Sequence, residues 1–115
     1  MNIVKISTSG LTSDDVIAVA RQQANISISE AALDAMTQSR KQIEALAASS
    51  SPVYGVSTGF GALAQRHIPA ESRTQLQRSL IRSHAAGTGA PVEREVVSAT
   101  MLLRLKTLAS GHTGA

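Results

Sequence analysis

The chain has 115 residues, no cysteine and a formal net charge of +3, from 11 Lys and Arg against 8 Asp and Glu. This length fits one small domain or part of a larger one, and the lack of cysteine excludes disulfides and thiolate metal sites. Positive residues are spread along the chain and aromatic residues make up only 2%, which argues against nucleic-acid binding because bases would find no stacking platform. No apolar run approaches a membrane span, and residues 1–9 are too polar for a signal peptide, so we expect a cytoplasmic protein.

The N-terminal quarter predicts a strand followed by a helix. Residues 2–7 alternate apolar and polar and predict a short edge strand. Thr12 or Ser13 can then cap a helix, and the two aspartates that follow suit the positive end of its dipole. An apolar stripe carries this helix to about Gln23, and we expect residues 25–28 to be an extended linker.

Three further helices follow from apolar spacing and helix-ending residues. The second begins at Ser29 and Glu30 and runs to about Ala48, before a Ser-Ser-Ser-Pro stretch that cannot continue it. The third begins near Pro69, which a first helical turn tolerates. Its predicted buried face is Leu76, Leu80 and Ile81, and its predicted end is at Gly87 and Gly89. The fourth runs from about Val92 to Leu108 and ends at Gly111, so the predicted fold class is mainly α.

Residues 49–68 form a long segment without a helical or strand period. Unpaired loops of this length in a compact protein are usually functional or disordered, and this one is too apolar for a solvated linker. It contains the only Tyr and the only Phe of the chain, Tyr54 and Phe60, beside three glycines. Tyr54 could donate or accept a proton in catalysis, or both rings could simply anchor the loop to the core. The glycine spacing does not match a phosphate-binding loop.

A second polar cluster, Ser83 and His84, lies at the predicted end of the third helix. An imidazole there can interact with the free carbonyls of the helix end, which is a purely structural role. His67 and His112 have no partner at metal-ligand spacing, so the sequence does not support a metal site. Neither Ser57 nor Ser83 has the surroundings of a nucleophile.

The loop and the segments after it resemble one enzyme family. Tyr54-Gly55-Val56-Ser57-Thr58-Gly59-Phe60-Gly61 resembles the tyrosine loop of the histidine and aromatic amino acid ammonia-lyases. The runs Leu76–Gly89, Met101–Leu105 and Leu108–Gly114 follow in the family's order and at similar spacing. The resemblance is strong over residues 50–115 and general before them.

The resemblance implies a mainly helical homotetrameric lyase with a short N-terminal strand and a long Gly-rich tyrosine loop. Its electrophile would be a methylidene-imidazolone, formed autocatalytically from an Ala-Ser-Gly outside residues 1–115. By the same resemblance Tyr54 matches the essential catalytic tyrosine, Gly61 a substrate-binding glycine, and Ser83 and His84 the pair that reads the substrate side chain. No metal is implied.

The pair at positions 83 and 84 distinguishes members of the family by substrate. Histidine-specific members resemble this Ser-His pair, whereas tyrosine lyases have His-Leu and phenylalanine lyases Phe-Leu. An imidazole at position 84 can exchange a hydrogen bond with a substrate imidazole, and such recognition discriminates strongly. We therefore expect degradation of L-histidine to trans-urocanate and ammonia. The alternatives are a tyrosine or phenylalanine ammonia-lyase, an aminomutase, or a non-catalytic helical interaction module.

One tripeptide invites a wrong assignment. Ala109-Ser110-Gly111 has the composition of the electrophile precursor, but its surroundings resemble a different family segment upstream of that precursor. We expect Ser110 to be an ordinary residue and Gly111 a helix cap. Residues 1–115 are then the N-terminal segment of a single larger lyase domain, inactive alone. Helix faces that pack on the remainder would be exposed and would favour self-association.

Overall fold

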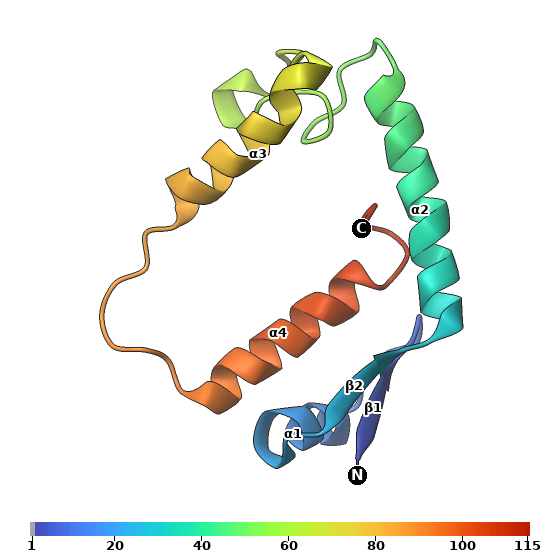
Figure 1. Ribbon diagram of the computed structural model, residues 1–115, viewed down its shortest axis with the longest axis vertical. Helices are drawn as coiled ribbons and strands as arrows, with labels where there is room; N and C mark the ends of the chain where they lie inside the picture. The colour runs from blue at the N-terminus through green and yellow to red at the C-terminus, as the bar shows by residue number, and fades with distance from the viewer. Residues whose placement is uncertain (1) are drawn as a thin grey trace. The chain divides into compact units, whose positions relative to one another are not determined.

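The computed structural model describes residues 2–115 and is mainly helical (Figure 1). In chain order the elements are β1 (Ile3–Ile6), α1 (Ser13–Gln22), β2 (Asn25–Ile28), α2 (Glu30–Ala48), the short 3-10 helix η1 (Gly61–Leu63), α3 (Ala70–His84) and α4 (Arg94–Leu108). They form two compact units, one from the chain up to Gln42 together with Pro91–Ala115 and the other from Ile43–Ala90. The predicted fold class is confirmed.

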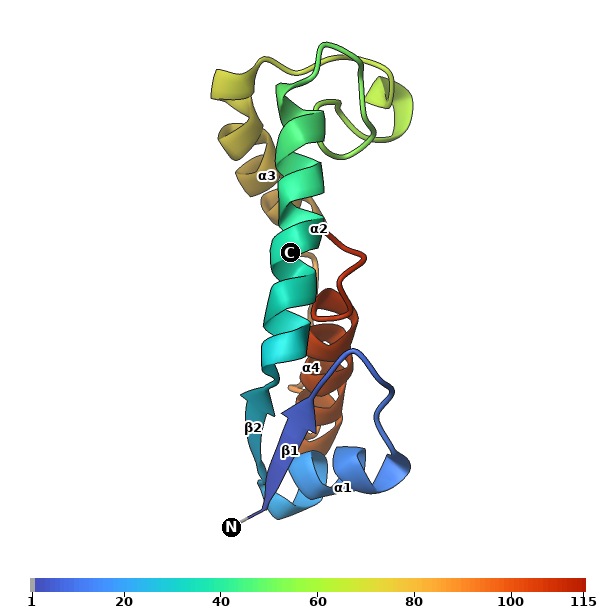
Figure 2. The ribbon, with the colours of Figure 1, turned by 90° about the vertical axis from the view of Figure 1, so that its right-hand side faces the viewer.

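The first unit begins with a parallel pair of strands joined through a helix. β1 and β2 pair from Ile3 opposite Asn25 to Ile6 opposite Ile28, and Figures 1 and 2 both show them side by side. The expectation that residues 25–28 are a linker was wrong. Asn25-Ile26-Ser27-Ile28 alternates polar and apolar residues, but four such residues do not distinguish a strand from an extended linker, and their partner strand lies a whole helix earlier in the sequence.

Local sequence signals fix the helices of this unit. Thr12 and Asp15 form a capping box at the start of α1, in which the Asp15 amide donates to Thr12 Oγ1 at 3.2 Å and the Thr12 amide to Asp15 Oδ2 at 3.0 Å. Gln23 ends the helix with a left-handed backbone, φ 56°. The Ser29 hydroxyl accepts from the Ala32 amide and opens α2, as predicted.

The core of the first unit lies where α4 crosses the strands. Ile6 and Ala109 are fully buried, and Val4 and Leu102 almost so. α1 packs against α4 and supplies half-buried side chains to the same cluster, which Figure 2 shows as the packing of α1, β1 and α4. Val4 and Ile6 come from the predicted strand and Leu102 from the predicted fourth helix, so their burial holds these elements together.

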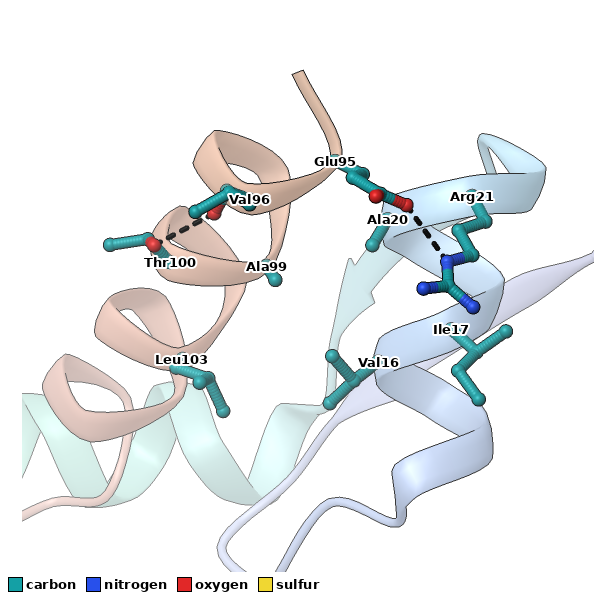
Figure 3. A pocket seen from close by; sticks show the side chains of 9 residues that line it. All are labelled: Val16, Ile17, Ala20, Arg21, Glu95, Val96, Ala99, Thr100 and Leu103. Carbon is teal, nitrogen blue, oxygen red and sulfur yellow. Dashed lines mark hydrogen bonds and ion pairs between the residues drawn. The ribbon is translucent and has the colours of Figure 1, made fainter. Parts of the chain in front are cut away.

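A shallow groove of about 440 Å³ lies between α1 and α4 (Figure 3). Its walls include Val16, Val96 and Leu103, and an ion pair of 2.8 Å from Arg21 to Glu95 crosses it. Val96 and Leu103 are 47% and 51% exposed. The expected exposure of apolar helix faces is thus confirmed in this unit, whereas the self-association that we expect from it stays a prediction.

The second unit contains the last turns of α2, residues 49–69 and α3. α2 ends at Ala48, as predicted, and α3 begins directly after Pro69. α3 ends at His84, earlier than the predicted stop at Gly87 and Gly89. On its predicted buried face Leu76 and Leu80 are half-buried, but Ile81 is 69% exposed, because nothing in this unit covers it.

Candidate active site

The loop between α2 and α3 is folded back on itself. Thr58 and His67 form an antiparallel bridge, with the Gly59 amide donating to the Arg66 carbonyl at 3.2 Å and the Ile68 amide to the Ser57 carbonyl at 2.7 Å. Only the single turn η1 interrupts the irregular backbone. Backbone hydrogen bonds within the loop therefore hold it together, and this geometry does not test its function.

Two buried hydroxyls hold the turn that carries the tyrosine. Ser57 is fully buried, and its hydroxyl accepts from the Val53 amide at 2.9 Å. Thr58 is 2% exposed; its hydroxyl accepts from the Gly55 amide at 3.3 Å and donates to the Gly59 carbonyl at 2.9 Å. Buried hydroxyls of this kind are costly to remove because their partners would be left unsatisfied. From the sequence, Ser57 was considered only as a nucleophile, and this structural role was missed.

Tyr54 and Phe60 are in edge-to-face contact, with ring centroids 5.6 Å apart and an interplanar angle of 79°. Their exposures differ: Phe60 is half-buried, whereas Tyr54 is 62% exposed. Within residues 2–115 the Tyr54 hydroxyl has no hydrogen-bond partner. Phe60 is thus the ring that anchors the loop, and Tyr54 presents its phenol at the surface of this unit.

The glycines of the loop are required for two different reasons. Gly55 and Gly61 have φ of +74° and +57°, a backbone region that side chains with a Cβ rarely adopt. Gly59 has an ordinary φ, but a Cβ there would lie 2.5 Å from Leu63 Cβ. Nothing lies within 4 Å of a Cβ on Gly61. The open space beside Gly61 is compatible with its predicted place next to a substrate.

Ser83 and His84 occupy the last turn of α3 and are exposed. His84 Nδ1 lies 2.9 Å from the Leu80 carbonyl oxygen and 2.9 Å from Ser83 Oγ, and the Ser83 hydroxyl donates to the same carbonyl at 2.9 Å. A carbonyl oxygen only accepts, so we assign the proton of the neutral imidazole to Nδ1. Nε2 is then an acceptor, and no protein group in the described part of the chain uses it.

The four predicted site residues all lie in the second unit, as two separate pairs. Tyr54 and Gly61 share the loop, and Ser83 and His84 share the end of α3. Across residues 2–115, no hydrogen bond or ring contact joins one pair to the other. Their meeting in one cavity therefore stays a prediction.

The Ala109-Ser110-Gly111 tripeptide is the end of α4. Ala109 caps the helix and its amide donates to the Leu105 carbonyl at 2.9 Å. Gly111 has φ +84°, and a Cβ there would lie 2.7 Å from Ala35 Cβ. The expectation that Gly111 caps α4 was wrong, because the cap is Ala109; Gly111 lies two residues further on, where the chain turns with a left-handed backbone and packs on α2.

Two features of other kinds of site are absent from residues 2–115. No three His, Asp or Glu side chains gather in a way that could hold a metal ion. Among the helices described there, none has both the length and the apolar character needed to cross a membrane.

Comparison with known proteins decides the family. The family model described as aromatic amino acid lyase matches residues 11–115. The chain belongs to the aromatic amino acid lyase family. Tyr54, Gly61, Ser83 and His84 all lie inside the matched range, so the family resemblance seen in the sequence is confirmed.

Curated relatives of this aromatic amino acid lyase chain are histidine ammonia-lyases. That of Streptomyces griseus is 61% identical over 99% of the chain, and that of Streptococcus pyogenes is 40% identical over 97%. The chain spans about a fifth of the length of these relatives, 22% in both cases. It is therefore similar to one segment of each.

Solved structures with the same arrangement include other chemistries. A tyrosine aminomutase from Streptomyces globisporus matches with a TM-score of 0.90 and 31% identity, over 97% of this chain and 21% of that one. An ergothionase from Treponema denticola matches with a TM-score of 0.92 and 29% identity, over 98% of this chain and 23% of that one. The lyase fold is thus shared by enzymes with different substrates, and position-by-position arguments are needed for specificity.

Proposed function

We propose that the full-length polypeptide containing this chain is a histidine ammonia-lyase, which converts L-histidine to trans-urocanate and ammonia in histidine degradation. The observation that carries the proposal is the Ser83-His84 pair, in a chain 61% identical to a histidine ammonia-lyase. The reaction breaks the bond from Cα to nitrogen and one Cβ–H bond and forms the Cα=Cβ double bond. The products are ammonia and the unsaturated acid.

His84 suits the recognition of a substrate imidazole. With Nδ1 directed to the Leu80 carbonyl, the free Nε2 of a neutral ring can accept the N–H of a second imidazole. A phenyl side chain offers no such donor, so the bond would discriminate in favour of histidine over phenylalanine, whereas a leucine at position 84 would favour a phenyl ring. Ser83 supports this geometry because its hydroxyl lies 2.9 Å from the same ring nitrogen.

Tyr54 is the proposed proton-transfer residue of the elimination. Its hydroxyl is exposed, has no partner within residues 2–115, and sits on a turn held by the Ser57 and Thr58 hydroxyls. Gly61, with open space beside it, is the proposed contact to the amino-acid end of the substrate. A methylidene-imidazolone, formed from an Ala-Ser-Gly outside residues 1–115, would supply the electrophilic carbon that activates the amino group for departure. The exposed phenol and imidazole fit a site completed by such a group.

The proposed enzyme is a cytoplasmic homotetramer. Exposed apolar side chains on α3 and α4, Ile81 and Met101 among them, support the covering of these faces by other parts of the assembly.

Product formation tests the proposal. The full-length enzyme is incubated with L-histidine, L-phenylalanine, L-tyrosine and ergothioneine, and urocanate, cinnamate, coumarate and the β-amino acids are measured separately. Urocanate from histidine is the expected result. Cinnamate or coumarate without urocanate would assign one of the alternative lyases, and β-tyrosine an aminomutase. No product from any substrate, with no effect of histidine on thermal stability, would indicate a non-catalytic module.

A further inference from the structure

One guanidinium joins the two ends of the tyrosine loop. Arg73 Nη1 donates to the Ala47 carbonyl at 2.7 Å, and Arg73 Nε donates to the Ile68 carbonyl at 3.0 Å. Ala47 lies in the last turn of α2 and Ile68 directly before Pro69 and α3. The Arg73 side chain therefore binds one carbonyl at the start of the loop and one at its end.

Neither carbonyl has a helical partner of its own. Ala47 belongs to the last four residues of α2, whose carbonyls lack an intrahelical donor, and Ile68 lies outside a helix. Hydrogen bonds from a charged, planar guanidinium are strong and fixed in direction, because the donors form a rigid fork. A lysine ammonium has no such fork and could not hold both carbonyls in the same geometry.

The location of Arg73 is informative in itself. It lies in the first turn of α3, where the positive pole of the helix dipole disfavours a cation. Stabilisation of α3 alone would favour an acidic residue at this position, such as the neighbouring Glu71. The carbonyl oxygens of Ala47 and Ile68 carry partial negative charge, which the start of a helix lacks. They therefore account for the presence of an arginine at this position.

A continuous set of hydrogen bonds connects this clamp to the tyrosine. Arg73 holds the Ile68 carbonyl, and the Ile68 amide donates to the Ser57 carbonyl at 2.7 Å. The Ser57 hydroxyl accepts from the amide of Val53, the residue before Tyr54. Each bond fixes a backbone group of the loop, so displacement of Ile68 would also displace the turn that carries the Tyr54 phenol.

We propose that Arg73 is a positioning residue for Tyr54, acting by clamping the ends of the loop formed by residues 49–69. Its effect on turnover rests on the proposed function, whereas its effect on loop order does not. Nothing in the sequence distinguishes this arginine from its neighbours on α3, since its two carbonyl partners are 26 and 5 residues away.

Hydrogen–deuterium exchange of the full-length enzyme tests the clamp. Arg73→Met should accelerate exchange in peptides covering residues 49–69 by about tenfold or more, because local opening of the loop no longer requires two charged hydrogen bonds to break. Arg73→Lys should give an intermediate rate. Arg94→Met is the matched control, since Arg94 lies in the first turn of α4 and has no hydrogen bond within the described residues. Unchanged loop exchange in Arg73→Met would overturn the proposal; if that variant does not fold, Arg73→Lys carries the same comparison.

Kinetics separate positioning from general damage. Arg73→Met should lower kcat about tenfold with a smaller change in KM, because the phenol acts in the reaction and not in binding. In a Tyr54→Phe background the same change should cause no further loss, since the group being positioned is already absent. An equal further loss there would refute the link from Arg73 to Tyr54. If the wild-type enzyme makes no urocanate, the proposed function fails, and exchange still decides whether Arg73 clamps the loop.

Discussion

The tightest point of the tyrosine loop is Gly59, and a single methyl group there should disturb the whole turn. A Cβ at this position would lie 2.5 Å from Leu63 Cβ and 3.1 Å from the Leu63 carbonyl oxygen. Leu63 Cβ is close to the backbone of η1 and cannot swing away as the end of a side chain could. In Gly59→Ala either η1 or the strand-like segment around Thr58 must move.

The size of the effect follows from the type of clash. The φ of Gly59 is not in the left-handed region, so the cost is overpacking alone, about 1–3 kcal/mol. At 1.4 kcal/mol for each factor of ten, this corresponds to roughly 5- to 150-fold faster local opening of the loop. Because misplacement of a reacting group by about 1 Å can cost about a hundredfold in rate, kcat should fall by about ten- to a hundredfold.

Exchange of loop amides and turnover, measured on the same full-length preparation, check this prediction. The Gly59 amide, bonded to the Arg66 carbonyl, and the Ile68 amide, bonded to Ser57, are the most direct reporters. Gly10→Ala is the control, since nothing lies within 4 Å of a Cβ at Gly10. Equal exchange rates and equal turnover in Gly59→Ala and Gly10→Ala would refute the predicted clash at Gly59.

Four further substitutions test separate parts of the argument. Tyr54→Phe should lower turnover by about 10²-fold or more with the fold intact by circular dichroism, as for loss of an acid–base group; near-normal turnover would exclude that role. His84→Leu should shift the ratio of kcat/KM for histidine over phenylalanine toward phenylalanine, and an unchanged ratio would exclude His84 as the specificity residue. Thr12→Ala removes the capping box of α1 and should cost about 1 kcal/mol, visible as faster amide exchange in residues 13–22, whereas Thr12→Ser should retain most of it. Gly111→Ala combines φ +84° with a 2.7 Å approach to Ala35 Cβ and should cost about 2–4 kcal/mol, seen as lower soluble yield and faster exchange in α4; a neutral result would contradict the packing of this turn on α2.

The sequence predicted the elements that depend on local signals. α1 begins directly after its capping residue, α2 ends before the serine-rich stretch, and α3 begins directly after Pro69, because caps and prolines act within a few residues. β2 was interpreted as an extended linker because its four alternating residues do not reveal the pairing with β1 that makes them a strand. Ile81 shows the other limit: periodicity identifies an apolar face, but not which part of a protein covers it.

The candidate site was predictable in part for the same reason. Tyr54 and His84 were found through motifs, which are contiguous in sequence. The groups that hold them were not found, because they act at a distance: Ser57 bonds back to Val53, and Arg73 reaches across the loop to Ala47. Such contacts become visible only when the chain is folded.

The edge-to-face pair of Tyr54 and Phe60 gives this segment a built-in optical probe. The segment contains one tyrosine and no tryptophan, so its near-ultraviolet fluorescence originates from a single ring on the loop. Emission intensity and anisotropy of that ring would then report the local motion of the phenol without any attached dye. Within residues 1–115, the side chain proposed to act in the chemistry is therefore also the one whose fluorescence can be followed.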